Sequence, residues 1–310
     1  MRLLMPLMIV TAFATLGCSR EPAPAPVDAA AMAAFATAQQ SWRAQRRERL
    51  LAPDGWTSLV GLHWIDRGDH FVGSAPTNGL RIAMGPPQLG MLSMDDGEVR
   101  FTAAEGVEVT VDGQPVTAPL ALRTDAHAEG PSVIGFGGGD GKATVIRRMG
   151  RLALRVRHAL APTRTQFAGL EYWPADADWQ VQARFVPHPP GRTIAIANII
   201  GGDEPMPNPG AVEFTVGGRT HRIEAIDEGG DTLFLVFADR TNGHGSYPAG
   251  RFMDVPRPDA EGRVTLDFNQ AYNPPCAFTP FATCPLPPPE NRLDLAVEAG
   301  EKAYRKAAHS

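Results

Sequence analysis

The chain of 310 residues carries 29 basic and 34 acidic side chains, which gives a formal net charge of −5. This balance argues against a nucleic-acid-binding protein, which would show a basic stripe or patch. Hydrophobic residues make up 43% of the chain, beside 32 glycines and 29 prolines. Such a composition is typical of a turn-rich globular protein with a sizeable core, and it excludes a largely disordered chain.

The first residues have the pattern of a secretory signal. Arg2 precedes an apolar stretch over residues 3–16, which has the length of a signal-peptide core and is short for a membrane span. Gly17 places a small residue directly before Cys18, and residues 16–18 resemble the cleavage box of bacterial lipoproteins. The sequence therefore predicts a signal peptide over residues 1–17 and a lipid on Cys18. The alternative is an ordinary secretory signal with an incidental cysteine.

A Pro- and Ala-rich segment follows over residues 18–31. Proline-rich segments are stiff and extended, which suits a tether between a lipid anchor and a folded body. In the bacterial sorting pattern, Ser19 rather than aspartate after the cysteine indicates the outer membrane. We therefore expect a lipid-anchored outer-membrane protein that faces the periplasm. Its expected partners are the membrane, through the anchor, and a ligand of unknown identity, but no nucleic acid.

Residues Ala29–Leu51 are predicted to form a helix, because Met32, Phe35 and Trp42 lie on one stripe at helical spacing. We expect this stripe to pack against the domain and the arginines of the second half to be largely solvated. A helix on the membrane surface is the alternative.

Beyond residue 53 the hydrophobic pattern changes to period two. Turn signals such as Asp96-Gly97 and Gly217-Gly218 separate short strand candidates, and residues 212–226 are predicted to form a hairpin. The candidates are residues 80–84, 91–94, 99–102, 107–111, 143–149, 152–156, 181–186, 193–200, 212–216, 220–225, 233–238, 264–268 and 293–297. We therefore predict a mainly β protein, an antiparallel β-sandwich or barrel-like domain with an N-terminal helix, as one domain over residues 32–310.

Familiar catalytic motifs are absent from the sequence. There is no Gly-x-Ser-x-Gly elbow and no His-Glu-x-x-His helix. The glycine run over residues 137–142 lacks the first glycine and the hydroxyl residue of a phosphate-binding loop, so we expect a hairpin loop there. The sequence predicts no metal and no cofactor.

Two cysteines remain after Cys18, namely Cys276 and Cys284. In an oxidising compartment a disulfide is the expected state of an even pair. Free thiols and metal ligation are the alternatives, although no histidine lies nearby at zinc-ligand spacing.

A rigid, proline-rich polar loop over residues 267–292 is the most unusual stretch of the chain. Together with the segment over residues 239–251, it supplies polar side chains that could converge into a ligand-binding site. The candidates are Asp239, Thr241, Tyr247, Arg251, Asp267, Asn269, Tyr272 and Asn273. We predict that Asp239, Tyr247, Arg251 and Asp267 lie within contact distance, because charges at strand ends are seldom buried unless paired.

A second basic group consists of Arg147, Arg155 and Arg157. Arg155 and Arg157 share one face of their predicted strand. If that face lines an interior they would attract an anionic ligand, and if it faces solvent they carry no function.

Three segments of the chain resemble a known family. They are residues 53–64 (Pro-Asp-Gly-Trp-Thr-Ser-Leu-Val-Gly-Leu-His-Trp), residues 237–241 with Tyr247 and residues 249–251, and residues 267–301. Over residues 42–302 the chain is similar to the bacterial and archaeal family called domain of unknown function 1684. The resemblance implies one domain and carries no reaction, cofactor or substrate.

Three functions follow as hypotheses. The first is an envelope lipoprotein whose β-rich domain binds a small or polymeric envelope ligand. The second is a hydrolase-like enzyme, with Asp239 or Asp267 as general base and Arg251 stabilising an anion. The third is a structural or interaction protein without a ligand.

Overall fold

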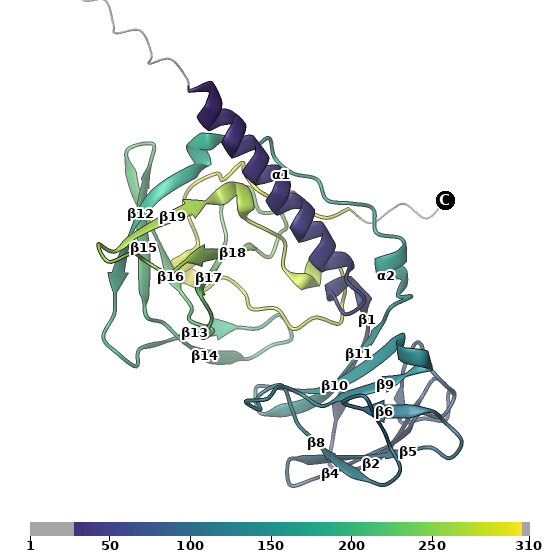
Figure 1. Cartoon of the computed structure of the whole chain (residues 1–310). Helices are drawn as coiled ribbons and strands as arrows, with labels where there is room; N and C mark the ends of the chain where they lie inside the picture. Colours follow the sequence, from purple (N-terminus) through teal and green to yellow (C-terminus); the bar gives the residue numbers. More distant parts are fainter. Residues whose placement is uncertain (1–27, 306–310) are drawn as a thin grey trace, which may run out of the picture.

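A computed structural model describes residues 28–305 (Figure 1). The predicted signal peptide, the lipidated Cys18 and most of the predicted tether lie outside the described residues. Helix α1 spans Ala29–Leu51, as predicted, so residues 29–31 belong to the helix and not to the tether. Asp28 caps its first turn, because one carboxylate oxygen accepts the backbone N–H groups of Ala30 (2.9 Å) and Ala31 (3.3 Å).

Two sheets packed face to face form the first body of the fold, between residues 59 and 158 (Figure 1, lower part). One is six-stranded, in the order β1 (Leu59–Ile65), β11 (Arg151–His158), β10 (Gly141–Arg148), β9 (Val133–Phe136), β6 (Val109–Val111), β7 (Gln114–Pro115). The other is five-stranded, in the order β3 (Leu80–Arg81), β2 (Gly68–Gly73), β4 (Gly90–Asp95), β5 (Glu98–Ala103), β8 (Leu120–Leu122). Residues from both sheets, including Leu92, Phe101, Val145 and Leu154, share one buried core.

A second body follows between residues 180 and 302, with α1 lying along it (Figure 1, upper part). Its main sheet has the order β16 (Arg219–Ala225), β15 (Gly210–Val216), β12 (Gln180–Pro187), β19 (Arg263–Asp267). Two hairpins complete it, β13 (Thr193–Ala197) with β14 (Asp203–Pro207) and β17 (Thr232–Phe237) with β18 (Arg251–Pro256). The ring of Phe268 lies at the centre of the core, 5.3–5.8 Å from the rings of Trp179, Phe214 and Phe237.

Short helical turns connect these strands. They are α2 (Pro162–Thr165) and the 3-10 turns Trp56–Ser58, Gly137–Gly139, Ala177–Trp179, Phe268–Gln270, Pro275–Ala277 and Pro289–Asn291. The glycine run therefore lies in the connection between β9 and β10, as predicted. Strands β15 and β16 form the predicted hairpin, and Gly217 and Gly218 both adopt positive φ angles (59° and 75°), which two-residue hairpin loops require.

The prediction of a mainly antiparallel β fold with one N-terminal helix is confirmed. Only β2 and β3 pair in parallel among the strand ladders of residues 28–305, and none of the sheets there closes into a barrel. The prediction of a strand over residues 293–297 is wrong. Leu293 and Val297 are buried there, but the backbone of this segment bonds with residues 238–251 through single contacts instead of a regular ladder.

Helix α1 buries a partly polar stripe, and buried Arg46 departs from the expectation of solvated arginines, whereas Arg47 and Arg49 are exposed. Gln39, Arg46 and Leu50 are its buried residues, whereas Met32 is 43% exposed. Arg46 forms an ion pair with Glu301 (2.8 Å), so a charged side chain anchors the helix to the second body. Between residues 28 and 305, no helix has the length and apolar character needed to cross a bilayer.

Candidate functional site

The sequence-predicted polar cluster contains a fully buried ion pair. Asp239 follows β17 and Arg251 begins β18, and Arg251 Nη2 lies 2.7 Å from Asp239 Oδ2 with both side chains 0% exposed. Arg251 also donates hydrogen bonds to the backbone oxygens of Val297 (2.8 Å) and Ala299. Burial lowers the pKa of Arg251, and the neighbouring Asp239 opposes that shift. The guanidinium therefore joins the β17–β18 hairpin to the C-terminal segment.

The second oxygen of Asp239 is also engaged by the protein. It accepts hydrogen bonds from the backbone N–H of Thr241 (2.8 Å), from the Thr241 hydroxyl (2.6 Å) and from the N–H of Val297 (3.2 Å). The Thr241 hydroxyl in turn contacts Ser246 Oγ at 2.8 Å. Because both carboxylate oxygens accept hydrogen bonds from neighbouring segments of the protein, the structure favours a structural role for Asp239, Thr241 and Arg251.

Asp267 and Asn269 belong to a different set of hydrogen bonds. Asp267 caps the Phe268–Gln270 turn and accepts a 2.6 Å hydrogen bond from Gln39 of α1. Asn269 is buried and bonds with the backbone of Asp176 in both directions. The structure therefore places Asp267 and Asn269 between α1 and the main sheet, and the hydrogen-bond partners of Asp267 differ from those of Arg251.

Tyr272 and Asn273 lie next to α1. The Tyr272 hydroxyl donates a 2.9 Å hydrogen bond to Asp254, and the Arg46 guanidinium lies 4.5 Å from the centre of the Tyr272 ring. The N–H of Asn273 donates to Glu301 at 2.8 Å, and the Asn273 side chain donates to the backbone of Lys302. Asn273 therefore fixes the backbone, whereas Tyr272 lines an open cleft.

The predicted disulfide is not formed in the structure, where Cys276 and Cys284 are both free thiols. The Cys284 sulfur instead accepts a hydrogen bond from the backbone N–H of Cys276 (3.1 Å). A hydrogen bond with Cys284 and, more weakly, one with Tyr247 hold the pKa of the Cys276 thiol below its usual value. Burial and the neighbouring Cys276 raise the pKa of Tyr247. The Tyr247 hydroxyl therefore lies at this thiol pair, whereas Asp239 bonds with Thr241, Arg251 and Val297.

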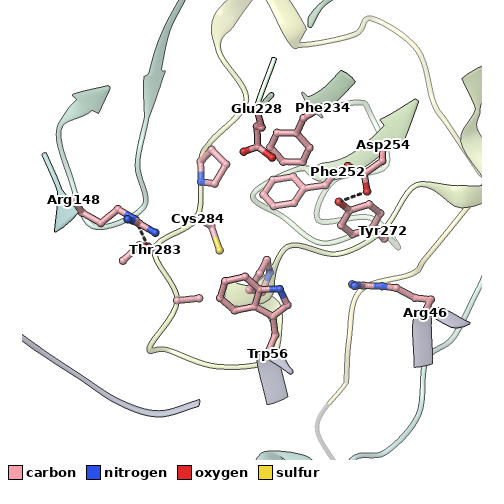
Figure 2. A pocket seen from close by; sticks show the side chains of 13 residues that line it. Arg46, Trp56, Arg148, Glu228, Phe234, Phe252, Asp254, Tyr272, Thr283 and Cys284 are labelled. Carbon is pink, nitrogen blue, oxygen red and sulfur yellow. Dashed lines mark hydrogen bonds between the residues drawn. The ribbon is translucent and has the colours of Figure 1, made fainter. Parts of the chain in front are cut away.

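A cavity of about 290 Å³ lies where α1, the first body and the second body meet (Figure 2). We call it the central cleft. Its lining residues are Arg46, Trp56, Arg148, Glu228, Phe234, Phe252, Asp254, Tyr272, Pro275, Ala282, Thr283, Cys284 and Pro285. Of the predicted ligand-binding residues, Tyr272 lines it, and so does Cys284 of the predicted disulfide. A neighbouring hollow shares Arg46, Trp56, Asp254 and Tyr272 with the cleft and adds Arg157, so the two spaces adjoin.

Four aromatic side chains line the central cleft. Trp56 comes from the turn after α1, Phe234 and Phe252 come from β17 and β18, and Tyr272 follows β19. Phe252 packs edge-on against Phe234 at 4.9 Å and against Tyr272 at 5.9 Å, which fixes all three rings. The cleft therefore combines fixed apolar surface with polar groups at its edge, as small-ligand sites do.

Two carboxylates stand on the second-body side of the cleft, Glu228 in the loop after β16 and Asp254 on β18 (Figure 2). Partial burial of the Glu228 carboxyl, with the nearby charge of Asp254, raises the pKa of Glu228. Asp254 accepts the Tyr272 hydroxyl.

Three arginines of the first body lie near the cleft, and we call them the arginine wall: Arg148 lines the cleft, Arg157 lines the neighbouring hollow, and Arg155 contacts the cleft through Thr283. Leu154 and Val156 face the core of the sandwich, so Arg155 and Arg157 lie on the opposite face of β11, toward Trp56 at 5.5 and 5.8 Å. Arg155 is 6% exposed and donates to Thr283 of the cleft (3.1 Å), as Arg148 does (3.2 Å). Burial, with repulsion from Arg148 and Arg157, lowers the pKa of Arg155 to about 10.

Several residues of this cleft escaped the sequence analysis. Trp56 lies in a segment of family resemblance, and the strand pattern predicts a shared face for Arg155 and Arg157. No sequence signal indicates that these residues lie close to Glu228 or Asp254. Within residues 28–305, no group of three His, Cys, Asp or Glu side chains could hold a metal ion.

Comparisons with known proteins identify the family. A family model described as a protein of unknown function (DUF1684) matches residues 165–302, and the chain belongs to this family. The chain is also similar to an uncharacterized protein of Haloarcula marismortui, solved by solution NMR, with 33% identity over 47% of this chain and 81% of that one and a TM-score of 0.38. A search among curated proteins gave no match. The matched residues cover most of the second body.

Proposed function

We propose that the protein is an envelope lipoprotein, anchored through Cys18 in the outer membrane, whose central cleft binds a small polar ligand. One observation carries the binding proposal. Four aromatic rings line the central cleft and its neighbouring hollow, together with three charged side chains that form no ion pair within residues 28–305, namely Arg157, Glu228 and Asp254, and these groups come from segments far apart in the chain. Unpaired charges beside apolar surface are costly to a fold, and such groups are typical of binding sites.

The size of the cleft suits a small molecule. Its cavity of about 290 Å³ adjoins a hollow of about 710 Å³ that Trp56 and Arg157 also line. Ligand pockets commonly span about 300–1,000 Å³. The cleft is also open to solvent, as the exposed Glu228 and Asp254 indicate, so a ligand could enter it without unfolding either body.

The hydrolase hypothesis receives no comparable support. Of its two candidate bases, Asp239 is fully buried, and Asp267 accepts hydrogen bonds from Gln39 and from the turn that it caps. Its anion-stabilising Arg251 donates to backbone oxygens. A substrate would have to displace these contacts, so binding in the central cleft is the better proposal.

Native mass spectrometry tests the binding proposal. The mass of the full-length Cys18→Ser variant, purified from the periplasm, is measured directly and again after incubation with the small-molecule fraction of a cell extract. We expect a bound small molecule, lost when Trp56→Ala is added and retained when the exposed Arg151→Gln is added as the matched control. If the parent protein carries no small molecule under either condition, the proposal is wrong.

A further inference from the structure

We infer that the ligand of the central cleft is dipolar, with an anionic group on the arginine wall and a cationic group beside Glu228 and Asp254. The inference rests on the proposed function and names the ligand class of that same site. It draws on four side chains, Arg155, Arg157, Glu228 and Asp254. None of these four takes part in any of the ion pairs formed within residues 28–305.

The anionic group follows from the arginine wall. Arg155 is 94% buried, and its Nε finds no acceptor among the described residues. The Nε of Arg157 is likewise buried without an acceptor. Only Arg148 has a carboxylate, Asp125, at 2.6 Å. Asp54 and Asp125 act on Arg157 and Arg155 without forming ion pairs with them, so both guanidinium groups keep a desolvation cost, and an anion that accepts hydrogen bonds from them offsets it.

The cationic group follows from the other side of the cleft. Glu228 and Asp254 are both carboxylates, they stand close enough for the Asp254 charge to act on Glu228, and no described lysine or arginine pairs with either. Arg46 of α1 also lines the cleft, but it is already paired with Glu301. Rings of Phe234, Phe252 and Tyr272 surround this end, and aromatic rings also attract cations.

The two sets of charges do not neutralise one another, because the fold holds them apart. The arginines are fixed on β10 and β11 of the first body, whereas the carboxylates are fixed on the second body. Arg157 and Asp254 even line the same hollow without forming an ion pair. A molecule that spans the cleft can satisfy both sets, whereas an ion of one sign satisfies one set and is repelled by the other.

The chemical class that fits is a short peptide with free termini and apolar side chains. Its carboxylate would bind to Arg155, Arg157 and the hydroxyl of Thr283, and its ammonium group would bind beside Glu228 and Asp254. The apolar side chains would pack on Trp56 and Phe252. A dipeptide or tripeptide is small enough for a cleft of this volume.

The test uses one mixture of apolar dipeptides in four forms, with free termini, with an amidated C-terminus, with an acetylated N-terminus, and with both blocked. Binding to the full-length Cys18→Ser variant is measured by isothermal titration calorimetry. We expect the free form to bind, and each single block to weaken binding about tenfold or more, because each removes a charge-assisted hydrogen bond.

Two variants assign each end of the ligand. In Arg157→Gln, amidation should no longer weaken binding, whereas acetylation still should. In Glu228→Gln, the reverse is expected. Arg151→Gln is the matched control, because Arg151 lies on the same strand but stacks on Trp64 (4.2 Å) away from the cleft, and it should behave as the parent protein.

The outcomes separate this inference from the proposed function. If a singly charged form binds as tightly as the free form, or if no dipeptide form binds and the molecule found by native mass spectrometry carries charge of one sign, the inference is overturned while the proposed function stands. If no molecule of any kind binds in the cleft, both are overturned.

Discussion

Arg251 and Asp239 lie 2.7 Å apart, Nη2 to Oδ2, and solvent reaches neither side chain. The pair joins the end of β17 to the start of β18, and Arg251 extends the contact to the backbone of residues 297–299. Such a pair shapes the core, because a buried charge keeps its position only with its partner in place. The polar residues of this segment therefore hold the second body together, and the open cleft lies on other residues.

Loss of the arginine should destabilise the protein strongly. We expect Arg251→Ala to lower the free energy of unfolding by about 3–5 kcal/mol, because it leaves the buried Asp239 carboxylate without its counter-charge. Urea denaturation followed by circular dichroism measures the change. Arg263→Ala is the control, since Arg263 is 64% exposed and its loss should cost less than about 0.5 kcal/mol. Equal midpoints for the two variants would contradict the structural role.

The local pattern of the sequence was sufficient to predict most of the fold. Helix α1 and the β15–β16 hairpin follow from short-range signals, namely an apolar stripe and the Gly217-Gly218 turn. Residues 293–297 show where such signals fail. Their alternating apolar pattern fits a strand. The Val297 N–H, however, donates to the Asp239 carboxylate, and the Ala299 oxygen accepts from Arg251, so these backbone groups are not available for a strand ladder.

The site was less predictable, because its parts come from distant segments. Polar residues near one another in sequence, such as Asp239 and Arg251, predicted a cluster, and the structure shows that both of these side chains are buried away from solvent. The cleft instead depends on the contact between two bodies, which brings Trp56 and Arg148 into one lining with Tyr272. Local periodicity cannot report such a contact, and only the shared face of Arg155 and Arg157 hinted at it.

In the absence of ligand, the buried Arg155 guanidinium should destabilise the folded protein. Its pKa is lowered to about 10, which means that the folded state disfavours the charged form at neutral pH. We expect Arg155→Met to raise the free energy of unfolding by about 1–2 kcal/mol. Thr283 keeps its hydrogen bond from Arg148, so the variant leaves no new orphaned group. Thermal unfolding measures the gain, and Arg151→Met, on the same strand but outside the cleft, should show none. A lower melting temperature for Arg155→Met would contradict this prediction.

Membrane attachment should depend on Cys18 alone among the three cysteines. The short apolar core before Gly17 and Cys18 predicts lipid on this residue. We expect Cys18→Ser to move the protein from the membrane pellet to the soluble periplasmic fraction, with loss of a lipid mass by mass spectrometry. Cys276→Ser is the matched control and should remain in the pellet. A Cys18→Ser variant that still sediments with membranes would refute the anchor.

The two thiols of the polar loop should differ in reactivity with pH. Hydrogen bonds with Cys284 and Tyr247 lower the pKa of Cys276, while the Cys276 side chain and burial raise the pKa of Cys284. Because the thiolate is the reactive form, reduced protein should be alkylated by iodoacetamide at Cys276 first, with a midpoint below that of an ordinary thiol. Cys284→Ala should move this midpoint upward, because it removes the larger of the two hydrogen bonds, and Tyr247→Phe should move it less. Labelling rates followed by peptide mass spectrometry across the pH range give both midpoints, and equal rates at the two cysteines would contradict the arrangement of this loop.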